Sequence, residues 1–142
     1  MSRSGYTEDY DGDYRFLHLY RGRVASATRG KRGQALLRDI LIAMDGMPSK
    51  RLIAHDLEAM DGAVCALGAA GKLRGIDMGA LDPDDAETVA YRFNVADCFA
   101  REIVWENDDC GRRNETPEER FVRMRKWVRS QIKDPLFDVI WC

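Results

Sequence analysis

The sequence has 142 residues, of which 45% are hydrophobic and 32% charged, and its formal net charge is −2. This length fits one globular domain, and the composition excludes a chain that is disordered throughout. The apolar stretches fall short of the roughly 18 residues that a membrane-spanning helix needs, and the acidic N-terminus is not typical of a secretory signal. We therefore expect a cytoplasmic protein that does not enter a membrane.

Residues 1–14 are polar and rich in acids and tyrosine, which predicts a flexible N-terminal arm. A first helix is expected from about Tyr14, because apolar residues recur after it at helical spacing. Its predicted buried stripe consists of Leu17, Tyr20, Val24 and Ala27.

Gly30 and Gly33 predict a turn after this helix, since glycine destabilises a helix interior by about 1 kcal/mol relative to alanine. A second helix is expected from about Gln34 to Asp45, with a broad apolar face. Gly46 is placed to end it.

The next segment is ambiguous between strand and helix. Residues 51–55 fit a short strand or the start of a helix, and the turn pair Asp61-Gly62 would let residues 63–65 pair back as a second strand. Small apolar residues over 66–73 predict a tightly packed helix that ends at Gly75.

Two further helices are signalled by their first residues. Asp82 can cap a helix that runs to about Phe93 and ends at Asn94 in a left-handed conformation. Asp97 can cap another helix, whose apolar positions include Phe99 and Ile103.

The strongest local signal in the chain begins at Thr116. Thr116 caps, Pro117 takes the first helical position, and Glu119 completes a capping box three residues after the cap. The helix that follows should stop by Asp134.

These elements predict a mainly α fold: a compact single-domain bundle of about five or six helices, which a small two-stranded β-ribbon near 51–66 could accompany. The helical domain covers 15–133, between the arm and an apolar C-terminal tail over 134–142. The predicted core consists of apolar residues on the helix faces: Leu17, Val24, Leu37, Ile40, Leu41, Leu67, Val89, Phe93, Ile103, Phe121, Met124 and Val128.

Charge is strongly segregated along the chain. Residues 15–38 hold seven basic residues and no acid, whereas residues 56–109 hold thirteen acids and four bases. Basic helices could simply pack beside acidic ones, or the basic segment could form a binding surface. In the second interpretation the candidate residues for binding a partner or nucleic acid are Arg21, Arg23, Arg29, Lys31, Arg32 and Arg38.

No motif for catalysis stands out. Cys65, Cys98, Cys110 and Cys142 form no C-x-x-C pair, and the segment around Lys31 lacks the order of a phosphate-binding loop. We therefore predict no cofactor, no metal site and no catalytic residue. An enzyme of unfamiliar type remains an alternative, and it would be built on three carboxylates: Glu102, Glu106 and Asp108.

The tail over 134–142 carries five apolar residues after a proline. It could fold back over the domain's own core. If it does not, Phe137 and Trp141 are the anchors expected in a partner interface.

Three motifs occur in combination: VCALGA at 64–69, EIVxEND at 102–108 and TPEER at 116–120. With the segment 21–35, this combination resembles a family of small phage- and prophage-associated bacterial proteins without an established activity. The resemblance covers roughly residues 20–132 and implies an origin in a mobile element, hence a bacterial host cell.

Three functions are compatible with these observations. The first is a non-enzymatic phage or prophage accessory protein that binds a host macromolecular complex, for example an anti-CRISPR-like inhibitor of a bacterial defence system. The second is a nucleic-acid-binding regulator that uses the basic segment 15–38. The third is the unfamiliar enzyme, and self-association is open in each case.

Overall fold

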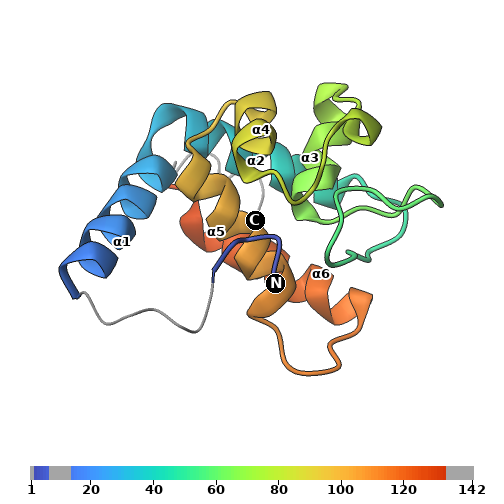
Figure 1. Cartoon of the computed structure of the whole chain (residues 1–142). Coiled ribbons are helices and arrows are strands. Elements are labelled where there is room, and N and C mark those ends of the chain that lie inside the picture. Colours follow the sequence, from blue (N-terminus) through green and yellow to red (C-terminus); the bar gives the residue numbers. More distant parts are fainter. Residues whose placement is uncertain (1, 7–13, 134–142) are drawn as a thin grey trace.

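The computed structural model describes residues 2–6 and 14–133, and the apolar tail with Phe137 and Trp141 lies outside the described residues (Figure 1). The described part of the chain is mainly helical, as predicted. Its helices are α1 (Tyr14–Arg29), α2 (Lys31–Asp45), α3 (Ala66–Arg74), the short 3-10 helix η1 (Met78–Ala80), α4 (Ala86–Phe93), α5 (Asp97–Asp109) and α6 (Pro117–Gln131).

Two helices organise the packing. α2 contacts α1, α3 and α6, while α5 contacts α1, α3, α4 and α6. α1 lies at one edge of the molecule and α3 at the opposite edge (Figure 1). α2 supplies the centre of the core because its apolar face is almost fully buried: Leu36, Leu37, Ile40, Leu41 and Met44 are each at most 1% exposed.

The predicted core is confirmed except at Leu17. The other eleven predicted residues, from Val24 to Val128, are all buried, whereas Leu17 is 42% exposed. α1 meets the rest of the molecule mainly through its second half, where Val24 is buried. Leu17 lies in the first half, and its helical spacing to Val24 does not bring it to the core.

The predicted turn between the first two helices is shorter than expected. Only Gly30 interrupts the helices, and Gly33 lies inside α2. A Cβ atom at Gly33 would lie 2.0 Å from the Ala27 carbonyl oxygen. Gly33 therefore permits close approach between α1 and α2, rather than forming a turn as its sequence suggested.

Two predicted helix caps are also corrected. α4 begins after Asp85, whose carboxylate accepts the Thr88 N–H at 3.3 Å, so Asp82 is not its cap. The cap position of α5 is Ala96, and Asp97 is the first helical residue. Asn94 ends α4 with φ +57°, as predicted.

The predicted capping box of α6 is confirmed. The Thr116 hydroxyl accepts the Glu119 N–H at 3.1 Å, and the Glu119 carboxylate accepts the Thr116 N–H at 3.3 Å. By contrast, the ribbon near 51–66 is reduced within the described residues to one antiparallel bridge, between Glu58 and Val64. A bridge of this size is not a strand pair.

Residues 2–6 are packed against α5 and do not behave as part of a loose arm. Arg3 and Ser4 are buried, at 5% and 0% exposure. Gly5 has φ +75°, a conformation that favours glycine, and its Cα approaches the Arg101 guanidinium closely. The described helices include none that is long and apolar enough to cross a membrane.

Candidate functional site

A basic surface runs over α1 and the start of α2. Arg23, Arg29 and Lys31 are exposed and form no ion pair with any residue that the structure describes. α1 contains no acid that could offset these charges along the helix. Arg32 is also exposed and donates to the Asn94 side-chain oxygen at 3.4 Å.

The six predicted basic residues do not act together. Arg21 donates to both oxygens of the buried Glu102 on α5 at 2.8 and 2.6 Å, while its own side chain is 48% exposed. The pKa of Arg21 is raised, chiefly by this hydrogen bonding to Glu102. Arg38 is half-buried within α2. Arg23, Arg29, Lys31 and Arg32 are exposed and are not held in an ion pair with a described acid, and we call these four residues the α1–α2 basic surface.

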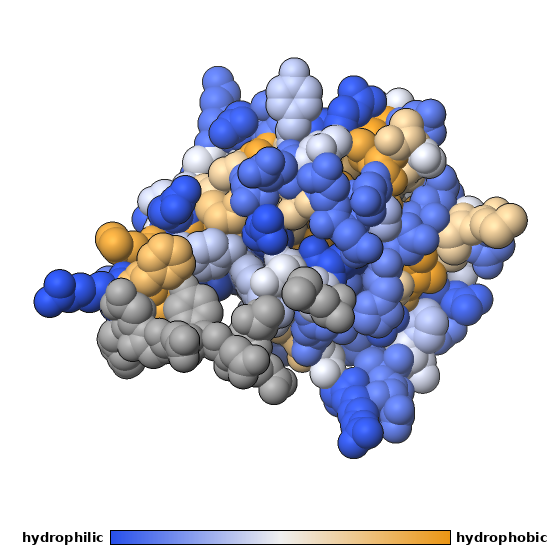
Figure 2. Space-filling view, in the orientation of Figure 1, coloured by the Kyte–Doolittle hydropathy of each residue, from blue (hydrophilic) through white to orange (hydrophobic). Residues whose placement is uncertain are grey.

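Apolar side chains are exposed on the same helix. Leu17 and Leu19 are 42% and 66% exposed, and Phe16 is 59% exposed. Figure 2 shows apolar side chains at the α1 edge of the molecule beside strongly hydrophilic ones. A helix that presents both charges and leucines offers two kinds of contact to a partner.

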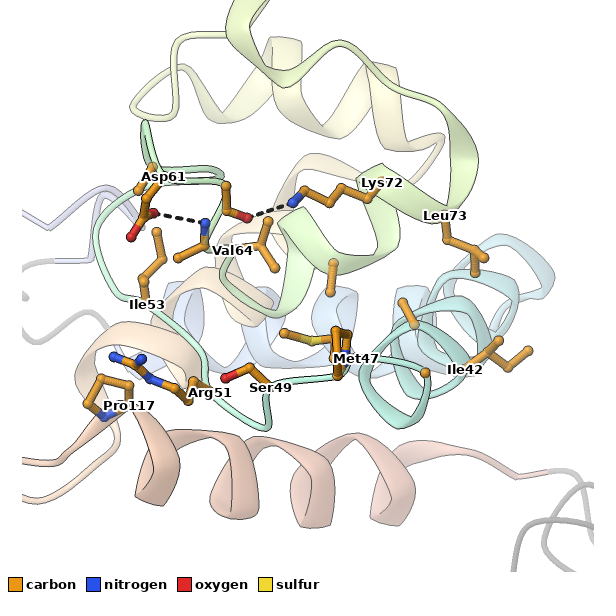
Figure 3. A pocket seen from close by; sticks show the side chains of 17 residues that line it. Ile42, Met47, Ser49, Arg51, Ile53, Asp61, Val64, Lys72, Leu73 and Pro117 are labelled. Carbon is orange, nitrogen blue, oxygen red and sulfur yellow. Dashed lines mark hydrogen bonds between the residues drawn. The ribbon is translucent and has the colours of Figure 1, made fainter.

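An apolar groove lies on another part of the molecule (Figure 3). It has a volume of about 810 Å³ and lies between the end of α2, α3 and the connecting loops. Ile42, Met47, Ile53, Val64 and Leu73 are among its apolar lining residues. The sequence did not predict this groove because its walls come from segments whose relative position depends on tertiary packing.

The charged side chains at the groove are engaged within the protein. Lys72 donates to the Gly62 carbonyl at 2.6 Å and lies 3.1 Å from a Glu58 oxygen. Arg51 pairs with Glu118 at 3.2 Å. The groove therefore offers apolar surface rather than a free charge that would select a ligand.

The three carboxylates of the enzyme alternative are involved in structural contacts. Glu102 accepts hydrogen bonds from Arg21 and from the Tyr6 hydroxyl, the latter at 3.0 Å. The Asp108 side chain is fully buried and accepts two hydrogen bonds from Arg3. Burial and the neighbouring Glu102 raise the pKa of Glu106.

The cysteines and histidines do not form a metal-ligand cluster within the described residues. Burial raises the pKa of the Cys98 thiol, and burial together with Glu106 raises that of Cys110 to about 12. His18 is exposed on α1, and His55 is 75% exposed with its Nδ1 3.8 Å from Asp108.

Comparisons of the chain with protein-family models, with curated proteins and with solved structures found no match.

Proposed function

We propose that this chain is a non-enzymatic accessory protein of phage or prophage origin that binds a host macromolecular complex. The α1–α2 basic surface would contact an acidic surface of that complex, and Leu17 and Leu19 would add apolar contacts. Its most concrete form is an anti-CRISPR-like inhibitor of a bacterial defence system. The phage origin rests on the sequence resemblance.

The observation that carries this proposal is the set of exposed cations without ion pairs. Arg23, Arg29 and Lys31 lie within a stretch of the chain that has no acids. Unpaired surface charges of one sign raise the rate of encounter with a surface of the opposite sign and add to specificity. They add little to the stability of an isolated fold.

The exposed leucines favour a protein partner over bare nucleic acid. Phosphate contacts use arginine, lysine and backbone N–H groups, and they leave leucine side chains without a partner. A protein interface buries apolar side chains at its centre and places charges at its rim. Leu17 and Leu19 lie on the same helix as Arg23 and Arg29, so α1 supplies both kinds of side chain to such an interface.

Charge reversal with a matched control tests the proposal. The tagged chain and two double variants would be used to capture partners from a lysate of the bacterial host. The test variant is Arg23→Glu with Arg29→Glu on α1, and the control is Arg113→Glu with Lys126→Glu, which are also exposed. Both double variants change the net charge equally, so they separate a local surface from total charge.

We expect the wild type and the control to capture one specific complex and the α1 variant to lose it. Reversing two interface charges should weaken binding by about tenfold or more, since like charges across an interface repel. Capture of no specific complex by the wild type, or equal capture by both variants, would contradict the proposal. Retention of DNA or RNA in a low-salt gel shift, lost steeply with added salt, would instead favour the nucleic-acid-binding regulator.

A further inference from the structure

A second groove lies along α6 and shares no lining residue with the groove near α3. It has a volume of about 660 Å³. Its lining residues come from α6 and from the residue that follows it: Phe121, Val122, Arg125, Lys126, Arg129, Ser130 and Ile132. Val122, Arg125 and Arg129 are spaced by three and four positions, so they share one helix face. We call this surface the α6 groove.

The α6 groove combines apolar and cationic surface. Val122 is apolar and yet 69% exposed. Three of the seven lining residues are basic and none is acidic. Arg125 pairs with Asp45 at 2.7 Å, which still leaves a net positive charge at the groove. The methylene stems of arginine and lysine add apolar surface below their charged ends. The groove therefore fits a ligand that is both apolar and acidic.

The end of α6 leads the chain to this groove. Ile132 lines the groove, and its ψ of 130° turns the backbone out of the helix. The Lys133 N–H donates to the Gln34 side-chain oxygen at 3.0 Å, and the Gln34 amide donates to the Gln131 carbonyl oxygen at 3.0 Å. These two hydrogen bonds fix Lys133 beside α2. The residues that follow therefore begin at one end of the α6 groove.

The composition of the C-terminal tail matches this groove. Residues 134–142 include five apolar residues, two acids and no base. The acids are Asp134 and Asp138, and the apolar residues are Leu136, Phe137, Val139, Ile140 and Trp141. The tail is therefore complementary to the groove in charge and in apolar surface.

The tail is also long enough to follow the groove. Val122 lies ten positions before Ile132, which corresponds to about 15 Å along a helix. The nine residues 134–142 span at most about 30 Å when extended. Asp138 can therefore reach back to the cations of the groove, and the residues after it can reach Val122.

We propose that the α6 groove binds this chain's own C-terminal residues 134–142. The tail returns along α6, with Asp138 beside the cations of the groove and residues 139–141 against Val122. The groove near α3 fits this tail less well. Its one lining residue from α6 is Pro117, at the opposite end of the helix from Lys133, and its basic side chains already form ion pairs.

This contact needs only the chain itself, so it does not depend on the proposed partner. Phe137 and Trp141 then cover α6 instead of anchoring a host complex. The α1–α2 basic surface stays available for that complex.

Photocrosslinking of the purified full chain tests the contact in the absence of a partner. A photoreactive amino acid replaces Val122 in one protein and Tyr91, which is 84% exposed on α4, in the control. Mass spectrometry identifies the crosslinked residues and their yield. We expect Val122 to crosslink to residues 136–142 and Tyr91 not to. In a mixture of ¹⁵N-labelled and unlabelled protein, a contact within one chain gives only peptide pairs with matching labels.

Charge reversal in the tail tests the physical cause of the contact. Asp138→Lys places a cation beside the basic lining of the groove, and Asp84→Lys is the matched control, since Asp84 is exposed in the turn before α4. Asp138→Lys should lower the crosslink yield from Val122 by about twofold or more, because like charges repel. Asp84→Lys changes the net charge equally and should leave the yield unchanged.

Three outcomes would overturn the proposal. The first is the absence of a crosslink from Val122 to the tail, or an equal crosslink from Tyr91. The second is a set of peptide pairs with mixed labels, which would show that the tail of a second copy occupies the groove. The third is an equal yield in Asp138→Lys and Asp84→Lys, which would show that charge does not hold the tail there.

Discussion

At the scale of single residues, Arg3 and Asp108 form the most deeply buried of the ion pairs between described residues, with side chains 2% and 0% exposed. The Asp108 carboxylate also accepts the His55 backbone N–H at 3.2 Å and the Asn107 amide at 2.8 Å. A buried pair stabilises a fold little relative to an apolar pair, but losing one partner leaves an uncompensated charge. This contact therefore fixes where residues 2–6 lie.

Replacing Arg3 with methionine should lower the free energy of unfolding at pH 7 by about 3–5 kcal/mol, because Asp108 then remains buried without its cation. Urea unfolding followed by circular dichroism measures this quantity. The control is Arg113→Met, an exposed arginine, which should change the unfolding free energy by less than about 0.5 kcal/mol. Equal effects of the two substitutions would show that the buried pair does not stabilise the protein.

The same pair predicts a dependence of stability on pH. Burial acts to raise the pKa of Asp108, but hydrogen bonds from Arg3 outweigh it and the pKa is lowered. A carboxyl with a lower pKa in the folded state stabilises the fold above its ordinary pKa, and this contribution is lost as the pH falls through the folded value. Stability should thus decline below about pH 5, and Asp108→Asn should decline less. An identical decline in both proteins would contradict this assignment.

At the scale of helices, the contact between α1 and α2 depends on Gly33. An added methyl group there would meet the Ala27 carbonyl oxygen at 2.0 Å, which is backbone and cannot move aside. Gly22 lies inside α1, and a Cβ added there has no atom within 4 Å. The two glycines therefore differ in packing although both lie in helices.

Gly33→Ala should lower the free energy of unfolding by about 1–3 kcal/mol through overpacking. Gly22→Ala should raise it by about 0.5–1 kcal/mol, because alanine loses less backbone entropy in a helix than glycine does. Thermal and urea unfolding of both variants measure these changes. A stabilised Gly33→Ala protein would show that α1 and α2 are not in close contact at Gly33.

Some helix signals carried by neighbouring residues were predictable, although the caps of α4 and α5 were not, and contacts between distant residues were not predictable. The Thr116 capping box and the Asn94 terminator involve residues a few positions apart, so the sequence displays them. Arg3 and Asp108 are 105 positions apart, and Arg21 and Glu102 are 81 apart. Sequence spacing could not show that the first contact anchors residues 2–6, or that the second pairs Arg21 with a buried carboxylate.

The candidate site also combines features that the sequence displays with features that depend on the fold. Charge counting predicted that the segment 15–38 is basic. It did not predict which cations stay unpaired, since that depends on which acids the fold brings near them. The helical spacing of Leu17 suggested burial, yet it is 42% exposed because α1 contacts the rest of the molecule along only part of its length.

At the scale of the whole molecule, the net charge of −2 conceals an uneven distribution. Most acids of the described chain either pair with an arginine that lies close in space or cap a helix. For example, Glu115 pairs with Arg123 at 2.7 Å and Asp45 pairs with Arg125 at 2.7 Å. The α1–α2 basic surface has no such compensation at Arg23, Arg29 and Lys31. The proposed contact with an acidic protein surface rests on these uncompensated cations and on the exposed leucines of the same edge helix.

Double substitution of the exposed leucines tests the apolar part of this surface. Leu17→Ser with Leu19→Ser should leave the unfolding free energy within about 0.5 kcal/mol, because both side chains are already largely solvated. The same variant should weaken capture of the host complex by at least about tenfold, since the loss of even one buried leucine removes about 1.5–3 kcal/mol of apolar transfer. Unchanged capture would show that Leu17 and Leu19 are not part of the interface.

Site-specific photocrosslinking in the bacterial host tests the account most directly. A photoreactive amino acid would replace Ser26 on α1 in one protein and Val122 on α6 in another, since both positions are exposed. We predict that Ser26 crosslinks to the acidic subunit of one specific complex and that Val122 does not. Crosslinks to that complex from Val122 alone, or from neither position, would contradict it.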